Sequence, residues 1–442
     1  MPRKSKTAVA VAEPEPPASV AEPEPESQPE PAPDPPASSE LEEELAAKKA
    51  EAEAPPPLQP FEFTAPRADL LKELKLVTGA VETKTTMPVL GTMLLEVSEF
   101  PAPGGTLTLR ATDLEIGYQT TLKVHARGEG SIAVSARRLL DIVQAMPEAT
   151  IRFKCLPEGA AEVTCERARF KLVAMRPGQF PELPAPPSTQ ACFSIGVADL
   201  ARQIEYTTCC VSAEESRYTL NRSLLMVGPS LLRMVATDGH RLGVMEQTVE
   251  IPGCLREQSF LLPKALLREL RRLLELNEEE GARIQIGHDD HHLFFTLGER
   301  RLLSRRLTGQ FPAWERVMPT HLPKVVKTDA GGLALSLKRV ALVADERSKA
   351  VKLELAPGQL TLIAMSGELG DATDTVIAEY AGEPLEIGFN HDYLLDFLAL
   401  SRGSQVLLSF KDGQSAALFQ AVPDPEKPVP WTYRYVVMPM RV

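Results

Sequence analysis

The chain repeats one pattern three times at a spacing that matches the size of a small domain. A strand-like segment runs into a turn at Ala111, at Ala236 and at Ala364, roughly 126 residues apart each time. A second series has nearly the same spacing and places a short strand before an amphipathic helix, as AVSARRLLDIVQAM, FLLPKALLRELRRLLEL and EIGFNHDYLLDFLALS. This period is too long for a solenoid repeat. The sequence therefore predicts three similar domains in one chain.

Each repeat combines two helical segments with many short strands. In the first repeat, FEFT alternates like a strand, and Pro66 then opens a helix whose apolar face holds Leu70, Leu71, Leu74 and Val77. FSIGVADLARQIEYTTCCV and LALSLKRVALVADE are the counterparts in the other two repeats. Turns rich in Gly, Pro and Asp separate the remaining strands. The pattern is typical of an α+β fold.

Proline-rich segments mark the boundaries between the units. ELPAPPST and VMPTHLPK join the repeats, and residues 1–60 consist mainly of Pro, Glu and Ala with almost no large apolar side chains. Such a segment buries too little surface to offset the entropy of ordering, so we expect a disordered tail that serves as a spacer or as a docking segment. The predicted units are the tail at 1–60 and domains at 61–187, 188–320 and 321–442.

Most of the negative charge lies in this tail. The 442 residues carry a formal charge of −12, and residues 1–60 hold 13 acidic and 5 basic side chains, which leaves −4 for the rest. The predicted folded part is therefore not a polycation that attracts nucleic acid over its whole surface. Any contact with DNA must come from a local basic surface.

The six cysteines do not follow a disulfide or metal-binding pattern. They form no CxxC pair, have no accompanying His spacing, and lie mostly in apolar or strand-like surroundings. We interpret them as reduced packing residues of a cytosolic protein. The sequence has no apolar run of about 20 residues, which a membrane span needs, and its N-terminal segment lacks the apolar core of a signal peptide. We therefore expect a cytoplasmic protein.

Signatures of catalysis are absent from the sequence. It contains no GxxxxGK[ST] phosphate loop, no GxSxG nucleophile elbow and no HExxH metal motif. Asp238 and His240 have no Ser or Cys nucleophile beside them, which argues against a catalytic pair. The cluster from His288 to His292 lies between two strand-like segments and indicates a hairpin turn rather than a metal site. We predict no catalytic residue, no metal and no cofactor.

One predicted helix carries a basic face. In KALLRELRRLLEL, five leucines form an apolar stripe, and the opposite side holds Lys264, Arg268, Arg271 and Arg272. Such a face can simply be solvated. Corresponding helices of the repeats also carry basic residues, namely Lys72, Lys75, Arg137, Arg138, Lys338 and Arg339. This recurrence favours one shared cationic surface that contacts nucleic acid.

Three strings connect the chain with a known family. ATDGHRL (Ala236 to Leu242), FPAWERVMP (Phe311 to Pro319) and the terminal YVVMPMRV (Tyr435 to Val442) together resemble the bacterial DNA polymerase III beta subunit, the sliding clamp family. TMPVLGTMLLEV and EIGFNHDYLLDFL are similar to further segments of that family. The resemblance runs from about Phe61 to Val442 and leaves out the tail and the proline-rich insertion AVPDPEKPVPWTY.

The resemblance implies the DNA clamp fold, an α+β fold with three similar domains that each place two helices inside and antiparallel sheets outside. Family members are rings of two subunits joined head to tail, so three repeats per chain would give a homodimer of six similar domains. By resemblance, Phe170 and Leu172 of one subunit face Leu342 and Val343 of the other. From sequence alone these four residues are equally suitable as core residues.

The function implied by the resemblance is mechanical. The ring encircles double-stranded DNA without regard to its sequence and tethers the replicative polymerase subunit, so it would be associated with the nucleoid. The clamp loader, repair polymerases and mismatch-repair proteins would dock through short peptide motifs, and catalysis would belong to the polymerase holoenzyme. A sliding ring needs only weak, salt-sensitive phosphate contacts. Lys84, Arg137 and Lys264 match family positions that face DNA, and helix faces or proximity add Arg138, Arg217 and Arg268.

The resemblance also implies a peptide-binding groove between the second and third domains. Its predicted residues are Leu220, Thr237, Gly239, His240, Arg241, Leu242, Pro312, Arg316, Val317, Asn390, Tyr393, Val436, Met438, Pro439, Met440 and Arg441. The apolar members form a trough, and the flexible thioether of Met suits a site with many partners. The arginines can bind carbonyl or acidic groups of an extended peptide. The family usually has a small apolar residue at the position of Gln414, so we expect a more polar far end.

Two other functions remain as alternatives. A divergent clamp paralog that serves repair or confers resistance to a clamp-targeting inhibitor would account for the unusual tail and for Gln414. A nuclease would need clustered metal-binding carboxylates, and the sequence offers no such pattern.

Overall fold

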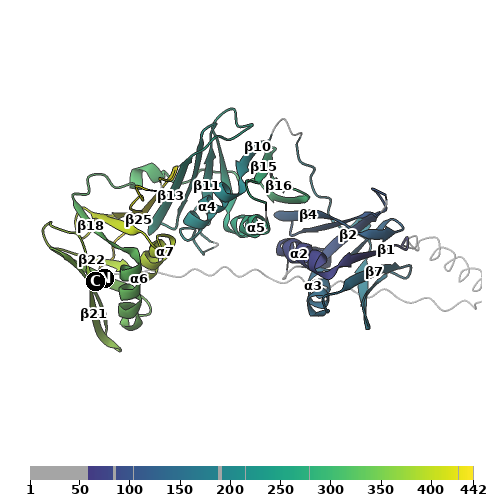
Figure 1. Ribbon diagram of the computed structural model, residues 1–442, viewed down its shortest axis with the longest axis horizontal. Helices are drawn as coiled ribbons and strands as arrows, with labels where there is room; N and C mark the ends of the chain where they lie inside the picture. The colour runs from purple at the N-terminus through teal and green to yellow at the C-terminus, as the bar shows by residue number, and fades with distance from the viewer. Residues whose placement is uncertain are drawn as a thin grey trace, which may run out of the picture. The chain divides into compact units, whose positions relative to one another are not determined.

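The computed structural model describes residues 58–82, 86–102, 104–187, 192–214, 216–277, 279–426 and 428–441. These residues form three domains, and in each domain two α-helices lie side by side against antiparallel strands (Figure 1). The predicted disordered tail lies outside the described residues, apart from positions 58–60. Within the same ranges, none of the helices combines the length and the apolar composition that crossing a bilayer requires.

The first domain runs from β1 to β9. Its helices are α2 (Arg67–Val77) and α3 (Ala136–Ala145). Its strands are β1 (Glu62–Pro66), β2 (Thr92–Ser98), β3 (Thr106–Thr112), β4 (Ile116–Lys123), β5 (His125–Arg127), β6 (Gly130–Ser135), β7 (Thr150–Leu156), β8 (Ala160–Cys165) and β9 (Ala168–Met175). The predicted first strand and helix are confirmed, because β1 leads directly into α2, along which Leu70, Leu74 and Val77 are buried. Pro66 ends β1 and precedes the helix instead of lying in its first turn, and Leu71 is half-buried.

The second domain repeats this arrangement. Its helices are α4 (Val197–Thr208) and α5 (Lys264–Glu275). Its strands are β10 (Phe193–Gly196), β11 (Arg222–Val227), β12 (Leu231–Thr237), β13 (Arg241–Thr248), β14 (Gln258–Pro263), β15 (Arg283–His288), β16 (His292–Leu297) and β17 (Arg300–Arg305). The leucine stripe of α5 is buried, as its spacing predicts. β15 and β16 pair antiparallel, which confirms the predicted hairpin from His288 to His292.

The third domain contains α6 (Ala330–Val340), the short 3-10 helix η6 (Ala341–Val343) and α7 (His391–Leu400). Its strands are β18 (Lys324–Asp329), β19 (Ala350–Ala356), β20 (Gln359–Ser366), β21 (Gly370–Ile377), β22 (Leu385–Asn390), β23 (Gln405–Phe410), β24 (Ala417–Ala421) and β25 (Trp431–Val437). The proline-rich insertion leads into β25. Trp431 at its end packs against Tyr206 of α4, with ring centroids 5.3 Å apart.

Two of the sheets continue from one domain into the next. In a thirteen-stranded sheet, β17 of the second domain pairs antiparallel with β4 of the first, and Leu302 lies opposite Tyr118. In an eight-stranded sheet, β25 of the third domain pairs antiparallel with β13 of the second, and Tyr435 lies opposite Gly243. Backbone hydrogen bonds therefore join neighbouring domains within the chain.

The register of both junctions follows the sequence repeat. Tyr118 lies opposite Ala111 in β3, and Gly243 lies opposite Ala236 in β12, so the same pair of positions recurs. In the third domain, Ala372 of β21 lies opposite Ala364 of β20. β21 is thus the third copy of the strand that β4 and β13 represent. It ends a four-stranded sheet of order β21-β20-β19-β22.

β9 is the corresponding copy of the strand that β17 represents. Over residues 168–173 it pairs with β8, and it pairs with β6 only at Ala174 and Met175. Among the described strands, nothing pairs with the other edge of 168–173. Such an edge presents backbone donors and acceptors that can pair with another strand. Among the strands equivalent to those of the two internal junctions, β9 and β21 are therefore the two that keep an unpaired edge in the described chain.

Candidate peptide-docking groove and DNA-facing helices

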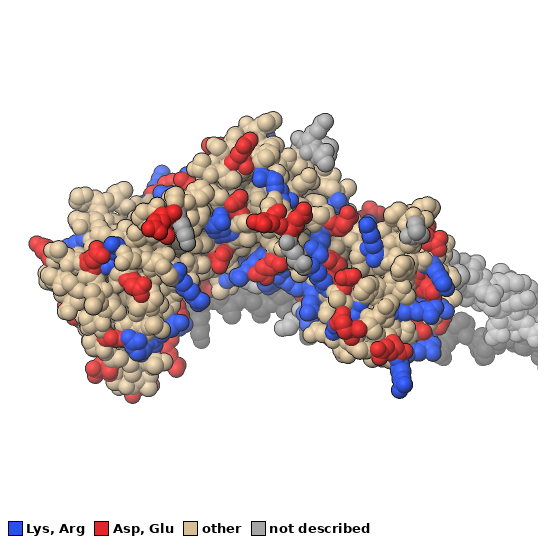
Figure 2. All heavy atoms as spheres, viewed as in Figure 1, with Lys and Arg blue, Asp and Glu red and all other residues tan. Residues whose placement is uncertain are grey.

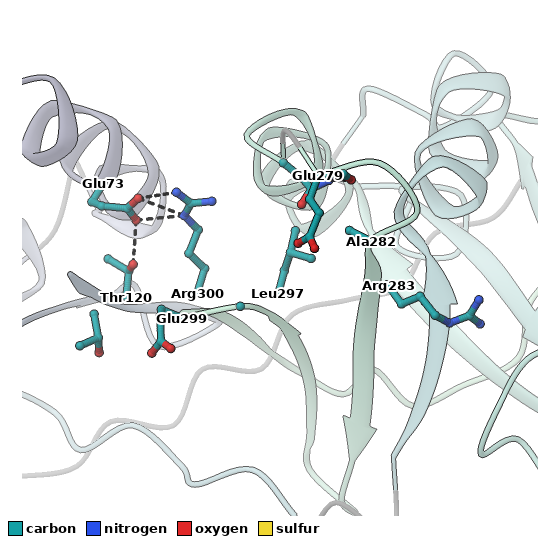
Figure 3. Close-up of a pocket in the computed structure, with 11 residues that line it drawn as sticks. Glu73, Thr120, Glu279, Ala282, Arg283, Leu297, Glu299 and Arg300 are labelled. Carbon is teal, nitrogen blue, oxygen red and sulfur yellow. Dashed lines mark hydrogen bonds and ion pairs between the residues drawn. The ribbon is translucent and has the colours of Figure 1, made fainter. Parts of the chain in front are cut away.

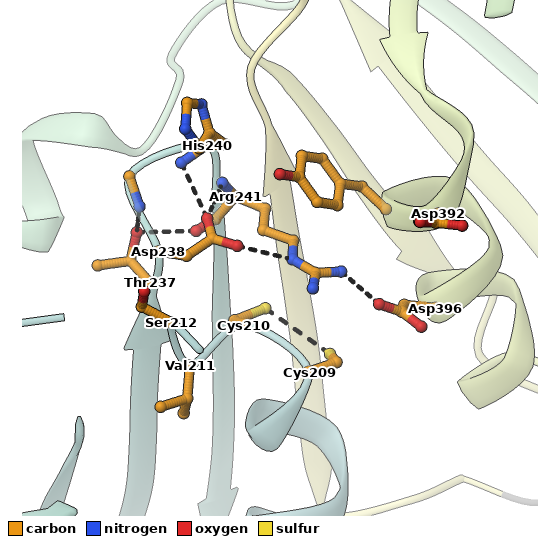
Figure 4. A network of polar contacts seen from close by, with 12 residues as sticks. Cys209, Cys210, Val211, Ser212, Thr237, Asp238, His240, Arg241, Asp392 and Asp396 are labelled. Atoms are coloured by element: carbon orange, nitrogen blue, oxygen red, sulfur yellow. Dashed lines mark hydrogen bonds and ion pairs between the residues drawn. The ribbon is translucent and has the colours of Figure 1, made fainter. Parts of the chain in front are cut away.

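The turn between β12 and β13 is held together by its own side chains (Figure 4). The Thr237 hydroxyl donates to the Arg241 carbonyl oxygen at 2.7 Å, and the N–H groups of His240 and Arg241 both donate to Asp238 Oδ1 at 2.9 Å. Gly239 has a φ of +91°, a conformation that a residue with a Cβ rarely adopts. The string ATDGHRL therefore specifies a fixed loop through local hydrogen bonds.

Arg241 connects this turn to the third domain. Its guanidinium binds Asp238 Oδ2 at 3.1 Å and Asp396 Oδ2 of α7 at 2.5 Å, and it donates to the Tyr435 hydroxyl at 3.1 Å. It also lies over the Tyr393 ring, with Cζ 4.4 Å from the centroid. Because four partners from two domains hold it, Arg241 is a preorganised element of the junction.

An apolar cluster lies beneath the turn and includes residues of both domains. Its buried members are Val235, Leu242, Val244, Trp314 and Val436. Leu242 and Val436 are only 2% and 1% exposed, so they support the surface from below. Val317 and Met438 are 44% and 43% exposed and offer apolar surface to a partner.

The C-terminal segment crosses from the second domain to the third. The Met438 N–H donates to the His240 carbonyl oxygen at 2.8 Å, and the Met440 N–H donates to the Gly388 carbonyl oxygen at 2.9 Å. Beside Met440 lies a cavity of about 920 Å³, a size suited to a bound ligand or peptide side chains. Its lining includes Ser348, Lys352, Ile363, Met365, Gln414, Pro439, Met440 and Arg441.

The structure brings most of the predicted groove residues to these two places. Leu220 lies beside the turn, 3.7 Å from the position of a Cβ on Gly239. Pro312 is half-buried, and Arg316 is exposed on the short helix Trp314–Val317. Asn390 instead caps α7, since its Oδ1 accepts the Asp392 N–H at 2.9 Å.

Sequence reasoning missed several residues of this region. Asp396 binds Arg241 from one turn beyond Asp392 on α7, and Trp314 anchors the apolar cluster from within the FPAWERVMP string. Lys352 and Met365 line the cavity from β19 and β20. Trp314 could have been found, because it lies within the FPAWERVMP string. Lys352 and Met365 could not, because the alternating pattern of a strand does not indicate that the strand borders a cavity.

The basic residues predicted to face DNA lie mainly at the helices. Figure 2 shows Lys and Arg side chains gathered where α2 and α5 lie in Figure 1. Arg137 and Arg138 are exposed at the start of α3, and Arg268 is exposed on α5. Lys264 is half-buried at the start of α5, with Nζ 3.5 Å from the Val211 carbonyl oxygen.

Two predicted DNA-facing residues differ from this group. Arg217 is exposed, but it binds Glu214 at 2.7 Å and donates to the Asp238 carbonyl oxygen at 3.3 Å, which places it beside the groove turn. Lys84 lies outside the described residues.

The four predicted interface residues lie beside the two open edges. On β9, Phe170 is 39% exposed and Leu172 is half-buried. Leu342 is 80% exposed and Val343 is half-buried in η6, which packs against β20 and β21. In the described chain these residues do not form a closed core.

A buried ion pair joins the first two domains, and sequence reasoning missed it. Arg300 of β17 donates to both Glu73 carboxylate oxygens at 2.5 to 3.1 Å, and the Thr120 hydroxyl donates to Glu73 at 2.7 Å (Figure 3). The Glu73 side chain is only 9% exposed. A glutamate on an amphipathic helix is usually solvated, so no sequence pattern indicates this contact.

Three family profiles cover nearly all of the described chain. They are the N-terminal, central and C-terminal domains of the DNA polymerase III beta subunit, matched at residues 61–184, 194–313 and 315–441. The beta sliding clamp of Pseudomonas putida is 36% identical over 382 residues, which cover 86% of this chain and 100% of the relative. The beta sliding clamp of Caulobacter vibrioides is 33% identical over 393 residues, with the same coverage.

Solved structures agree with these relatives. The sliding clamp from Pseudomonas aeruginosa bound to griselimycin has a TM-score of 0.78 and 35% identity, covering 87% of this chain and 100% of that one. The beta sliding clamp from C. crescentus has a TM-score of 0.77 and 32% identity, with the same coverage. Sequence profiles, relatives and fold therefore agree that this chain belongs to the DNA polymerase III beta subunit family, the beta sliding clamps.

Proposed function

We propose that the protein is a ring-shaped sliding clamp that encircles duplex DNA and tethers the replicative polymerase for processive synthesis. The observation that carries this proposal is the threefold unit in which β9 and β21, the equivalents of the strands paired at the two internal junctions, each keep an unpaired edge. The clamp contributes no catalysis, and the polymerase activity belongs to the holoenzyme. The proposed boundaries are 61–187, 188–320 and 321–442, with the tail at 1–60 as an appendage.

Two copies of the chain close the ring when β9 of each pairs with β21 of the other. Leu302 and Phe170 are each the third residue after a two-residue hairpin turn, and Leu302 lies opposite Tyr118. Since Ala372 is the counterpart of Tyr118, the same register places Ala372 opposite the partner subunit's Phe170. Because the two strands run antiparallel, the next residue of β9, Lys171 of the partner subunit, then lies opposite Asp371.

Side-chain chemistry supports this register. The same register places Leu369 opposite the partner subunit's Val173. These side chains are 59% and 88% exposed in the single chain, so pairing would remove two apolar side chains from water. Ala372 and Asp374 lie on the face of β21 that α6 covers, where Arg339 binds Asp374 at 2.5 Å. The partner subunit's Phe170 would lie on that same face, beside η6 and within reach of Leu342.

Reversing the charge of Lys171 tests the register. We expect Lys171→Asp to raise the dimer dissociation constant about tenfold, because like charges directly opposite in a sheet repel. The double variant Lys171→Asp with Asp371→Lys restores the opposite-charge pair and most of the affinity. Sedimentation velocity at several concentrations measures the change.

Lys154 provides a matched control for this test. Lys154→Asp makes the same charge change on β7, away from the open edge, and leaves dimerisation unchanged. If Asp371→Lys fails to rescue Lys171→Asp, the register is wrong, even where a dimer forms by another contact.

DNA is held mainly because the ring is closed around it, so the basic residues serve as weak and mobile contacts. Arg137, Arg138 and Arg268 present exposed charge from α3 and α5, and Lys264 adds a half-buried ammonium group. Contacts of this kind are independent of base sequence and weaken as salt rises. They slow escape of an opened ring while still permitting sliding.

We expect Arg137→Glu combined with Lys264→Glu to shorten the lifetime of the loaded clamp on circular primed DNA severalfold, with a smaller salt dependence. The lifetime is measured by gel filtration of labelled clamp on nicked plasmid. The matched control is Lys154→Glu with Arg256→Glu, which changes net charge equally at exposed sites on β7 and in the loop before β14. Equal lifetimes of the two double variants would exclude a DNA contact by Arg137 and Lys264.

The groove at the β12–β13 turn and the C-terminal segment is proposed to bind peptide motifs of the polymerase subunit, the clamp loader, repair polymerases and mismatch-repair proteins. Val317 and Met438 provide exposed apolar surface, and the cavity beside Met440 admits further side chains. Gln414 lines that cavity and gives it a polar end. We place the protein in the cytoplasm, on the nucleoid.

A further inference from the structure

Two adjacent cysteines lie directly beneath the groove. Cys209 and Cys210 follow α4, and their Sγ atoms are 3.8 Å apart with the two sulfurs turned toward each other (Figure 4). Cys209 is half-buried and Cys210 is fully buried. Among the described cysteines, Cys209 and Cys210 are the pair whose sulfur atoms contact each other.

The surroundings favour the thiolate form at Cys209. The hydrogen bond with the Cys210 thiol lowers the pKa of Cys209; burial opposes this, and the charge of Arg241 lowers the pKa further. Burial raises the pKa of Cys210. A partly accessible thiol with a lowered pKa beside a second thiol is the arrangement found in peroxide-sensitive cysteine pairs.

A buried hydroxyl lies next to the pair. Tyr433 is 4% exposed, and its interaction with Cys209 also lowers the pKa of that thiol. A Cβ on Gly243 would lie 3.0 Å from Cys210 Sγ and 3.4 Å from the Tyr433 hydroxyl, so the two groups are close neighbours. A hydroxyl that donates to Cys209 favours the thiolate form of that residue.

Backbone hydrogen bonds connect the segment that contains and follows the two cysteines to a residue of the proposed groove. The Cys210 N–H donates to the Thr207 carbonyl oxygen at 3.0 Å, and the Ser212 N–H donates to the Leu220 carbonyl oxygen at 3.0 Å. Leu220 and Arg241 are both proposed groove residues. A change in the backbone at 209–212 therefore alters the hydrogen bond to Leu220, and a change in the charge of the thiols alters their interaction with Arg241.

We propose that Cys209 and Cys210 form a redox modification site, at which hydrogen peroxide converts the two thiols into a reversible vicinal disulfide that weakens peptide binding in the groove. The regulatory part rests on the proposed docking function. The modification itself depends only on the geometry of the two thiols.

The reaction balances with one peroxide. The Cys209 thiolate attacks a peroxide oxygen, the O–O bond breaks, and the leaving hydroxide takes a proton to become water, which leaves a sulfenic acid. The Cys210 sulfur then attacks the sulfenic sulfur, the S–O bond breaks, and the departing hydroxide leaves as water with the thiol proton. Two thiols and one peroxide give one disulfide and two waters.

Ring closure strains the end of α4. Adjacent Cα atoms are about 3.8 Å apart, below the range of about 4.4–6.8 Å that disulfides usually span. The backbone at Cys209 is helical, with φ −61° and ψ −28°, so the eight-membered ring forms only if this last turn opens. A strained disulfide is easily reduced, which makes the modification reversible.

Mass spectrometry of the full chain tests the modification. Trypsin releases residues 203–217 (QIEYTTCCVSAEESR), which contain both thiols and no other cysteine. After peroxide and iodoacetamide, we expect this peptide without alkyl groups and two hydrogen atoms lighter than the dithiol, and dithiothreitol restores double alkylation. A doubly alkylated peptide after peroxide, a sulfinic acid at Cys209, or a disulfide to another cysteine would overturn the proposal.

Binding measurements test the regulatory part. A fluorescein-labelled peptide carrying the clamp-binding motif of the polymerase subunit is titrated with reduced and oxidised protein, and we expect at least tenfold weaker binding after oxidation. Cys210→Ser removes this response, and the matched control Cys192→Ser retains it. Equal affinity of the two forms, once the disulfide is seen by mass, overturns the regulatory part.

The design separates the two proposals. If the reduced protein does not bind the peptide, the docking function fails, while the mass result still decides whether the disulfide forms. Thermal unfolding of Cys210→Ser identifies loss of folding, and trapping of its sulfenic acid with dimedone identifies Cys209 as the attacking thiol.

Discussion

Deletion of residues 438–442 is expected to abolish peptide binding while leaving the dimer intact. β25 ends at Val437, so its pairing with β13 and β24 survives the deletion. The lost residues include Met438 and Met440, whose N–H groups bind the His240 and Gly388 carbonyl oxygens. Without them the groove loses its exposed methionine and one wall of the cavity.

We expect the dissociation constant of the polymerase-motif peptide to rise at least 100-fold, because a few anchor side chains carry most of the binding energy in such sites. Fluorescence polarisation measures the affinity, and native mass spectrometry measures the dimer. Deletion of residues 1–57 serves as the control and leaves both unchanged. Peptide affinity retained within a few-fold by the shortened chain would place the binding site elsewhere.

Removal of the Arg300 side chain is expected to lower the free energy of unfolding by about 3–5 kcal/mol, the typical cost of leaving a buried charge without its partner. Glu73 lies 9% exposed between Arg300 and Thr120. In Arg300→Ala the carboxylate keeps only the Thr120 hydroxyl. Urea denaturation followed by circular dichroism measures the loss.

The same strand supplies a matched control. Arg305 of β17 also binds a first-domain carboxylate, Glu115, at 3.0 Å, but both side chains are more than 60% exposed. Arg305→Ala should therefore cost no more than about 1 kcal/mol. Glu73→Leu combined with Arg300→Met should recover much of the stability, because apolar pairs often replace buried ion pairs. Equal costs for Arg300→Ala and Arg305→Ala would show that burial does not matter at this junction.

Local sequence patterns predicted the elements and part of the groove. The leucine spacing of α5 predicts its buried stripe, and the alternation and proline before α2 predict where that helix begins. The ATDGHRL string is sufficient for the turn, because Thr237, Asp238 and Gly239 satisfy its hydrogen bonds and its positive φ within a few residues. These features depend on neighbours in the chain, so the sequence alone contains their cause.

Contacts between residues far apart in the chain could not be predicted from local patterns. Arg241 and Asp396 are 155 positions apart, and Glu73 and Arg300 are 227 positions apart. A charged residue on a helix or strand has the same local pattern whether it is solvated or paired in a junction. Only packing of the domains decides between these states, because burial and distance set the strength of the ion pair.

The sequence by itself determined a threefold unit, its helices and strands, and the turn that marks the groove. The tertiary structure alone decided which edges pair within the chain, which edges stay open at β9 and β21, and that Cys209 and Cys210 lie beneath the groove. The physical reason is that periodicity encodes which face of an element is buried, whereas strand pairing and the strength of buried charges depend on surfaces that meet only after folding.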